Sequence, residues 1–275
     1  MEFIEILKAI LFGIVEGITE WLPISSTGHM ILLNEFVTLN VSEEFWEMFE
    51  VVIQLGAILA VVVLFWNQLF PFQFRKKPVI RADIFSMWFK IVFACIPAAV
   101  VGILFDDQID ALFYNYQTVS IALIVFGILF LVIENRNRHF KASICRIEDI
   151  SYLTAFMIGL FQLIAAVFPG TSRSGATILG ALLIGVSRTV AAEFTFFLAI
   201  PVMFGASLLK LLKFGLAFTV SEAVILLVGM VVAFLVSILV IQFLLSYIKK
   251  NDFKVFGWYR IILGVVVLGY FALLG

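Results

Sequence analysis

Long apolar runs, separated by charged or proline-containing breaks, follow one another along the whole chain. Six of these runs are uninterrupted, and each is near the length of about 20 helical residues that crosses a hydrocarbon core of about 30 Å. They cover residues 48–66, 85–104, 118–134, 190–212, 222–248 and 257–274. The pattern predicts six transmembrane helices, and we expect residues 1–275 to form a single integral membrane domain.

Two further apolar regions, 1–39 and 150–187, are interrupted near their middles by the polar segments 23–29 and 169–175, each of which begins with proline. A proline lacks the backbone donor and restricts the residue before it, so neither region can be one continuous helix. Each region therefore predicts a helix, a polar loop and a second helix.

The two interrupted regions resemble each other when the second is shifted by 146 residues. The matched pairs are Gly13 with Gly159, Glu16 with Gln162, Pro23 with Pro169, and Ser26 with Ser172. Each region is followed by three predicted spans. We therefore predict an internal duplication, with one copy in residues 1–135 and the other in residues 150–275.

Basic residues orient the predicted spans. Lysines and arginines are concentrated in segments 67–84 and 136–149 and again at Lys249 and Lys250, so these segments are expected to be cytoplasmic. Segment 105–117, which has three aspartates and no basic residue, is expected to be external together with both termini. This requires both interrupted regions to be re-entrant. The predicted fold is all-α and polytopic, with six transmembrane helices plus two re-entrant helix-loop-helix hairpins in an inverted repeat, whose loops meet near the midplane.

Composition supports a membrane protein and excludes other classes. Hydrophobic residues make up 63% of the chain and charged residues 13%, which no soluble globular domain of this size matches. The net charge of −1 gives no reason to expect a nucleic-acid partner, and two cysteines do not indicate a disulfide framework. Because Glu16 and Glu20 interrupt the first apolar run, we expect it to belong to the mature protein rather than to a signal peptide.

Glu16 and Glu20 are four residues apart on one predicted helix and share a face with Gly13 and Gly17. A charged carboxylate at the bilayer centre costs about 2.5–3.5 kcal/mol, so this face is expected to point into the protein. The two carboxylates are interpreted as oxygen ligands of a divalent cation or as acid/base groups. The alternative is a structural pair that is hydrogen-bonded to a neighbouring helix.

The first polar loop leads into a predicted helix start rich in hydroxyl groups. The residues concerned are Ser25, Ser26, Thr27, Gly28 and His29. Serine and threonine cap helices, and the free N–H groups of a helix start suit an anion. Capping does not explain His29, whose side chain is well suited to proton transfer near neutral pH.

The second polar loop contains another hydroxyl-rich helix start, made by Thr171, Ser172, Arg173 and Ser174. Arg173 is far from any basic loop, and its planar guanidinium suits phosphate oxygens. The alternative role for Arg173 is a salt bridge to one of the two glutamates. Arg260, inside the last span, lacks such a loop and is expected to be structural or interfacial.

Segments 16–29 and 169–175 closely resemble the two signature stretches of the undecaprenyl-diphosphatase family, the bacitracin-resistance type, and the resemblance covers the full length of the chain. It implies hydrolysis of undecaprenyl diphosphate to the monophosphate in the bacterial plasma membrane, with Mg²⁺ or Ca²⁺, as part of carrier-lipid supply for peptidoglycan synthesis. The positions that match the family are Glu16, Glu20, Ser26, His29 and Arg173.

The resemblance and the residues together predict a site between the two helix starts that opens to the external side, with the polyprenyl tail left in membrane lipid. Arg173 and backbone N–H groups would hold phosphate, and Glu16 and Glu20 would hold the cation. Either Ser26 attacks with His29 as its base, or His29 activates water. The oligomeric state, a homodimer included, stays open.

Two other functions are alternatives to hydrolysis of a polyprenyl diphosphate. A type-2 phosphatidic acid phosphatase would need a second catalytic histidine, and the remaining histidine, His139, lies in a basic loop without that setting. A secondary transporter or lipid flippase shares the inverted repeat with interrupted helices. Phosphate release from purified protein distinguishes hydrolysis from transport.

Overall fold

The computed structural model describes residues 3–73, 79–138, 140–215 and 218–274. His139 and the basic residues at 75–77 lie outside this part of the chain. Apart from two isolated bridges and a single 3-10 turn (Ile147–Asp149), the regular structure described is α-helical. The helices are α1 (Phe3–Thr19), α2 (Ser26–Phe36), α3 (Glu43–Val52), α4 (Gln54–Leu64), α5 (Trp66–Leu69), α6 (Ala82–Phe113), α7 (Tyr116–Asn137), α8 (Tyr152–Val167), α9 (Arg173–Ile184), α10 (Arg188–Phe214), α11 (Val220–Ile248) and α12 (Lys254–Leu274).

Six helical segments of the described chain are long and apolar enough to cross a membrane, which confirms the predicted number and order of spans. They are Glu43–Leu64, Ala82–Phe105, Tyr116–Asn137, Arg188–Phe214, Val220–Ile248 and Lys254–Leu273. The first is built from α3 and α4, which meet at Ile53.

The segment predicted as an external loop, 105–117, is mostly helical, so that prediction was wrong in its secondary structure. Helix α6 continues to Phe113, and Asn115 already caps α7 by accepting from the Thr118 N–H at 2.9 Å. Residues 106–113 contain neither glycine nor proline, so nothing in them stops the helix after its apolar part has ended.

The helices of the two interrupted regions are shorter than the transmembrane spans. Helices α1 and α2 have 17 and 11 residues, and α8 and α9 have 16 and 12. Each falls short of the about 20 residues that a full crossing requires. These lengths are consistent with two re-entrant hairpins, which stay a prediction.

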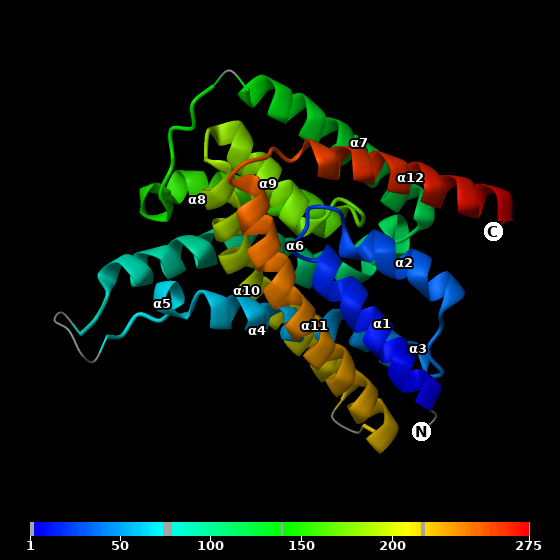
Figure 1. The fold of residues 1–275 in the computed structure, drawn as a ribbon. Coiled ribbons are helices and arrows are strands. Elements are labelled where there is room, and N and C mark those ends of the chain that lie inside the picture. The colour runs from blue at the N-terminus through cyan, green and yellow to red at the C-terminus, as the bar shows by residue number, and fades with distance from the viewer. Residues whose placement is uncertain (1–2, 74–78, 139, 216–217, 275) are drawn as a thin grey trace.

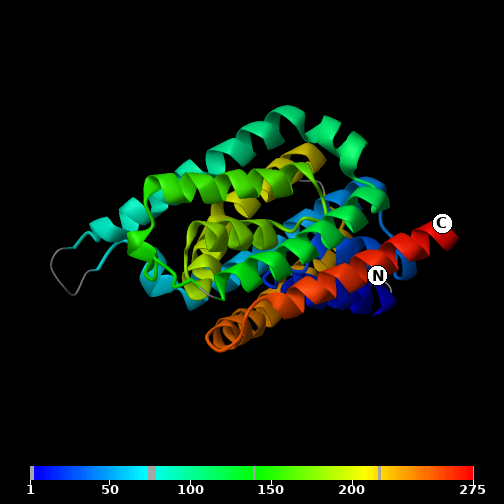
Figure 2. The same cartoon turned by 90° about the horizontal axis from the view of Figure 1, so that it is seen from above.

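Corresponding helices of the two copies pack in corresponding ways. Helix α1 lies along α11, α8 lies along α6, and α7 and α12 lie side by side in both views (Figures 1 and 2). A Cβ atom added at Gly13 would lie 2.6 Å from the Gly229 carbonyl oxygen, and one at Gly159 would lie 2.1 Å from the Ala94 carbonyl oxygen. These matched glycines therefore let the first helix of each hairpin approach a span of the other copy.

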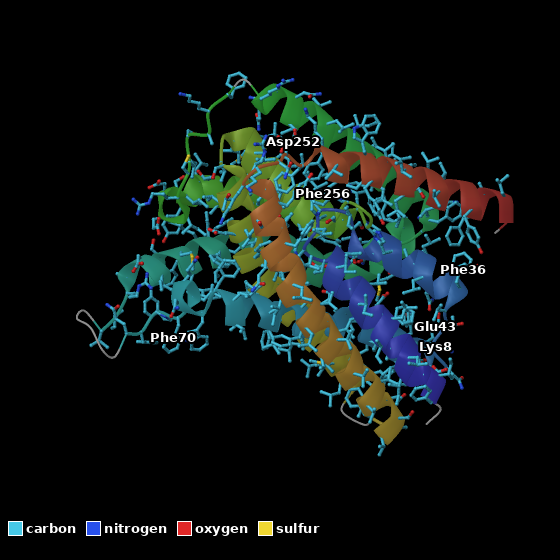
Figure 3. The ribbon with its side chains drawn as sticks, in the orientation of Figure 1. Lys8, Phe36, Glu43, Phe70, Asp252 and Phe256 are labelled. Atoms are coloured by element: carbon cyan, nitrogen blue, oxygen red, sulfur yellow. The ribbon has the colours of Figure 1, made fainter. Side chains whose placement is uncertain are left out.

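The ends of the molecule agree with the predicted arrangement of loops. Figure 1 places both chain ends on one side, and α5 and segment 140–150 on the other. In Figure 3, Lys8, Phe36 and Glu43 lie near the side of the chain ends, whereas Phe70 lies at the opposite side. The described parts of segments 67–84 and 136–149 thus lie at one side of the helical body, opposite the chain ends, and the side of the membrane that each faces stays a prediction.

The two hairpins differ in burial. In α9, every residue from Ser174 to Leu182 is buried, whereas in α2 only Gly28 and Met30 are. Helix α9 packs against α7, α8 and α10, and α2 packs against α1 and α7. Helix α9 therefore lies in the centre of the fold, and α2 lies at its periphery.

Candidate active site

The two polar loops end in matching helix caps. Ser25 precedes α2 and accepts from the Gly28 N–H at 3.4 Å, and Ser172 precedes α9 and accepts from the Gly175 N–H at 3.1 Å. Capping therefore pairs Ser25, rather than Ser26, with Ser172. The offset between the copies grows from 146 at the prolines to 147 at the caps, because the second loop has one more residue.

Both cap residues have strained backbones. Ser25 has a φ of 74° and Ser172 a φ of 68°, and they are the non-glycine residues with positive φ in the described chain. Such conformations cost about 1–3 kcal/mol each and persist where the surroundings over-determine them, often at functional sites. The strain marks the two helix starts as a constrained pair.

Arg260 of α12 joins the two loops. Its guanidinium donates to the carbonyl oxygens of Pro23 at 3.2 Å, Gly170 at 3.0 Å and Thr171 at 2.7 Å. The side chain is fully buried and lies over the ring of Phe126. Arg260 is therefore structural, as one of the two expectations had it, and it is not interfacial.

Gly170 is what allows the second loop to pass close to α7. It has a φ of 88°, and an added Cβ would lie 2.6 Å from the carbonyl oxygen of Val119. Only glycine tolerates both the left-handed conformation and this contact. The one additional residue of the second loop thus occupies a position where no side chain fits.

Glu20 lies at the centre of the polar cluster. Its Oε1 accepts from Nη2 of Arg173 at 2.7 Å, and its Oε2 accepts from the Ser26 hydroxyl at 2.8 Å. Arg173 also donates from Nη1 to the Thr195 carbonyl oxygen at 3.1 Å. The structure thus brings together the Glu20 carboxylate, the Ser26 hydroxyl six residues away and the Arg173 guanidinium 153 residues away.

Hydroxyl groups of the second helix start connect it to the first loop. Ser174 donates to the Glu20 carbonyl oxygen at 3.1 Å, and the Ser172 and Ser174 hydroxyl oxygens are 3.0 Å apart. Thr171 is buried, and its hydroxyl has no partner among the described residues.

The two remaining residues predicted to bind substrate lie in the first turn of α2. Thr27 is half-buried there. Gly28 packs against Leu123 of α7, where an added Cβ would lie 3.2 Å from a leucine methyl group. Gly28 therefore lets the helix start lie close to α7.

His29 is held at both ring nitrogens. Nδ1 lies 2.7 Å from the Ser25 carbonyl oxygen, and Nε2 lies 2.7 Å from the Tyr259 hydroxyl oxygen. Its predicted partner, Ser26, is bonded to Glu20 instead. Of the two predicted alternatives, the hydrogen bonds thus do not include a Ser26–His29 contact, and the role of each residue stays a prediction. The structure adds Tyr259, which sequence reasoning missed because nothing local marks one tyrosine in an apolar span.

Glu16 is buried on the same side of α1 as Glu20, and neither of its oxygens has a hydrogen-bond partner in the described chain. Gln162, the residue that matches Glu16 in the second copy, is also buried without a partner there. An unpartnered buried carboxylate is costly unless a cation or proton accompanies it.

The donor set around Glu16 bears on the expected cation. No group of three or more acidic, histidine or cysteine side chains in the described residues could hold a metal ion by itself. Mg²⁺, however, is usually held by one or two carboxylates together with substrate phosphates and water. Glu16 and Glu20 fit that mode of binding, because Glu16 offers both oxygens and each Glu20 oxygen retains a lone pair.

Six helical segments long and apolar enough to cross a membrane define a polytopic membrane protein, and two interrupted helix pairs bring hydroxyl, carboxylate and guanidinium groups together in its interior. The chain belongs to the family described as "Bacitracin resistance protein BacA", whose model matches residues 9–266. This match confirms the resemblance seen in the two polar segments.

Curated relatives match the chain over almost its whole length. The chain is 68% identical over 272 residues to the undecaprenyl-diphosphatase of Desulfitobacterium hafniense, covering 99% of this chain and 98% of that protein. It is 70% identical to undecaprenyl-diphosphatase 1 of Clostridium acetobutylicum, and the match covers 98% of this chain and 99% of that protein. It is 65% identical to the undecaprenyl-diphosphatase of Enterococcus faecalis, and the match covers 98% of each protein.

Proposed function

We propose that this protein is an undecaprenyl-diphosphate phosphatase that hydrolyses undecaprenyl diphosphate to undecaprenyl phosphate and inorganic phosphate. The reaction returns the lipid carrier to bacterial cell-wall synthesis and confers resistance to bacitracin. The observation that carries the proposal is the contact of Glu20 with both Ser26 and Arg173 at two facing helix starts, in a chain that belongs to this family.

Phosphate binding follows from the donors at the two helix starts. The first turns of α2 and α9 present backbone N–H groups that have no acceptor within their own helices. Arg173 has five N–H donors and contacts three acceptors, Glu20, Thr195 and the sulfur of Met203, so donors remain for a phosphate oxygen. The polyprenyl tail stays in the surrounding membrane lipid.

The hydrogen bonds favour Ser26 as nucleophile with Glu20 as its base. Glu20 takes the hydroxyl proton as the Ser26 oxygen bonds to the terminal phosphorus, and the bond from that phosphorus to the bridging oxygen breaks, so that undecaprenyl phosphate leaves. Water then attacks the phosphorus of the phosphorylated serine, and His29 takes a proton from that water. The bond from phosphorus to the Ser26 oxygen breaks, Glu20 returns its proton to that oxygen, and inorganic phosphate leaves. Arg173 stabilises the charge that develops on the phosphoryl oxygens in both steps.

We further propose that Glu16 and Glu20 hold a divalent cation, Mg²⁺ or Ca²⁺. When bound, such a cation neutralises charge on the diphosphate. The unpartnered oxygens of Glu16 support this proposal, since they are buried carboxylate oxygens that no donor of the described residues satisfies.

Replacing Glu16 by glutamine is expected to lower turnover and to move the cation titration to higher concentration by about tenfold, because a hard cation prefers a charged oxygen ligand. The fold should persist, since glutamine already occupies the matched buried position 162. The measurement is phosphate release against added Mg²⁺ or Ca²⁺. Glu35→Gln, an exposed position on α2, is the matched control, and an unchanged titration in Glu16→Gln would return Glu16 to a structural role.

The chain is a multi-pass membrane protein of a bacterial family, and we propose that it resides in the inner membrane with its site open to the external side. The contact of Gly170 with Val119 supports this orientation. Val119 lies in the first turn of α7, at the opposite end from the basic residue Arg136.

Cysteine labelling tests that orientation, after replacement of Cys95 and Cys145. A membrane-impermeant reagent should label Leu112→Cys in intact cells, whereas Ala142→Cys should require permeabilisation. Both positions are exposed, so access depends on the side of the membrane and not on burial. Labelling of position 112 only after permeabilisation would overturn the inverted arrangement.

The activity itself is tested by phosphate release from a polyprenyl diphosphate by purified protein in detergent, with and without a chelator. Detergent removes the two compartments that a flippase needs, so release under these conditions requires hydrolysis. Movement of the lipid in sealed vesicles without release of phosphate would instead favour a flippase.

A further inference from the structure

His29 has one ring nitrogen that must donate and one that must accept. The Ser25 carbonyl oxygen, 2.7 Å from Nδ1, can only accept a hydrogen bond, so Nδ1 carries a proton. In the neutral ring Nε2 is then the acceptor. The Tyr259 hydroxyl, 2.7 Å away, is therefore the donor to Nε2.

The position of Tyr259 is fixed by its neighbours on α12. Arg260 is tied to both loops, and successive helical residues differ by about 100° around the axis, so Tyr259 faces α2 while Arg260 faces the loops. Close contact of Gly257 and Gly264 with α7 holds the helix in place. The rings of Tyr259 and His29 are nearly parallel, with an angle of 5° and centroids 5.6 Å apart.

These contacts leave His29 without a free nitrogen. Nδ1 is occupied by the Ser25 carbonyl and Nε2 by the Tyr259 hydroxyl, and Ser26 is bonded to Glu20. A base in this arrangement reaches a nucleophile only through the tyrosine hydroxyl. Tyr259 is 44% exposed, and its hydrogen bond to His29 is not enclosed by protein, so no protein group blocks a further partner for its oxygen.

We propose that Tyr259 relays the proton that His29 takes up during the reaction. As water attacks phosphorus, one O–H bond of the water breaks and its proton passes to the Tyr259 oxygen. At the same time the original tyrosine proton passes to Nε2, so Tyr259 stays neutral and His29 becomes the imidazolium. Its new Nε2–H then donates to Tyr259. After phosphate has formed, the Nε2 proton returns to the tyrosine oxygen while the tyrosine releases a proton to a second water molecule, which restores the starting state.

The relay rests on the proposed function, because it gives His29 the role of base in phosphate release. Tyr259→Phe removes one oxygen and keeps the ring, and Tyr270→Phe is the matched control on the same helix, where Tyr270 contacts the rings of Phe36 and Phe271. Thermal stability of both variants is recorded, so that unfolding can be recognised.

Tyr259→Phe should lower kcat by about 10- to 100-fold with KM unchanged, a fraction of the effect of a general base. The dependence of kcat on the D₂O fraction should change from curved, for two protons in motion, to linear. Tyr270→Phe should match the parent in both measurements. A kcat for Tyr259→Phe at or above the parental value would overturn the relay, because it would mean that the hydroxyl is only an obstacle at Nε2.

A second measurement separates the relay from the activity. The chain has two histidines, so in a His139→Gln background the ¹⁵N spectrum of the imidazole reports on His29 alone. The parent should show a protonated Nδ1 and an unprotonated, hydrogen-bonded Nε2, and Tyr259→Phe should shift the Nε2 signal. A protonated Nε2 in the neutral parent, or an Nε2 signal that Tyr259→Phe leaves unchanged, would overturn the relay. Absence of phosphate release from the parent would instead contradict the proposed function.

Discussion

Arg173→Ala should reduce phosphate release about a thousandfold, in the range found when a charge-stabilising donor is removed from a phosphoryl-transfer site. The change removes the guanidinium that contacts Glu20, so that the buried carboxylate loses its positively charged ion-pair partner. Breaking a buried ion pair from one side costs about 3–5 kcal/mol of unfolding free energy, so thermal stability should fall as well.

Arg173→Lys distinguishes a phosphate clamp from a simple counter-charge. Lysine keeps the charge near Glu20 but replaces the planar fork by a point charge, so a clamp should lose at least about tenfold in turnover while stability changes little. Phosphate release and thermal unfolding of detergent-purified variants are the measurements. Arg146→Ala, which removes an exposed ion pair, is the control. Parental turnover of Arg173→Lys would leave Arg173 as an ion-pair partner of Glu20 and no more.

Glu20→Gln should lower turnover about a hundredfold, because the amide is no base for the Ser26 hydroxyl and can accept only through one atom. Glu20 uses both oxygens, one for Ser26 and one for Arg173. Glutamine has one oxygen and one NH2 group, so Arg173 would either face the NH2 group, which cannot accept a hydrogen bond, or lose its partner at position 20. The loss should appear in kcat.

A double variant separates the two roles of Glu20. Glu20→Gln combined with Arg173→Met removes both buried charges, so thermal stability should recover toward the parent while phosphate release stays at least as low as in Glu20→Gln. Recovery of stability without recovery of activity is the expected result. Substantial turnover in Glu20→Gln would show that Ser26 is not activated by Glu20 and would favour direct attack by water.

The apolar pattern predicts the number and order of spans because hydrocarbon thickness imposes a length that is visible in the sequence. The inward face with Glu16 and Glu20 was predicted correctly for a similar reason, since a carboxylate in lipid is too costly. The contact of Glu20 with Arg173 was foreseen as an alternative, because an intramembrane arginine must find a partner.

Contacts between distant segments could not be predicted in this way. Tyr259 and His29 are 230 residues apart, and their meeting depends on how α12 packs on α7. Arg260 carried a usable signal, because an arginine inside a span calls for buried acceptors when its side chain faces the protein. The offset of one residue between the loops was hidden, since identical serines at positions 25 and 26 allow either alignment.

The unequal burial of the two hairpin helices gives the duplicated halves different freedom to vary. Nearly every side chain of α9 is enclosed, so a substitution there alters packing on several sides and is selected against through folding yield. The outer face of α2 meets few neighbours, and Phe36 at its end is 65% exposed. Changes along the outer face of α2 therefore alter few packing contacts, at little cost to folding. Of the two matched helices, α9 is constrained in sequence by its packing, whereas α2 can accept substitutions on the face that the protein leaves uncovered.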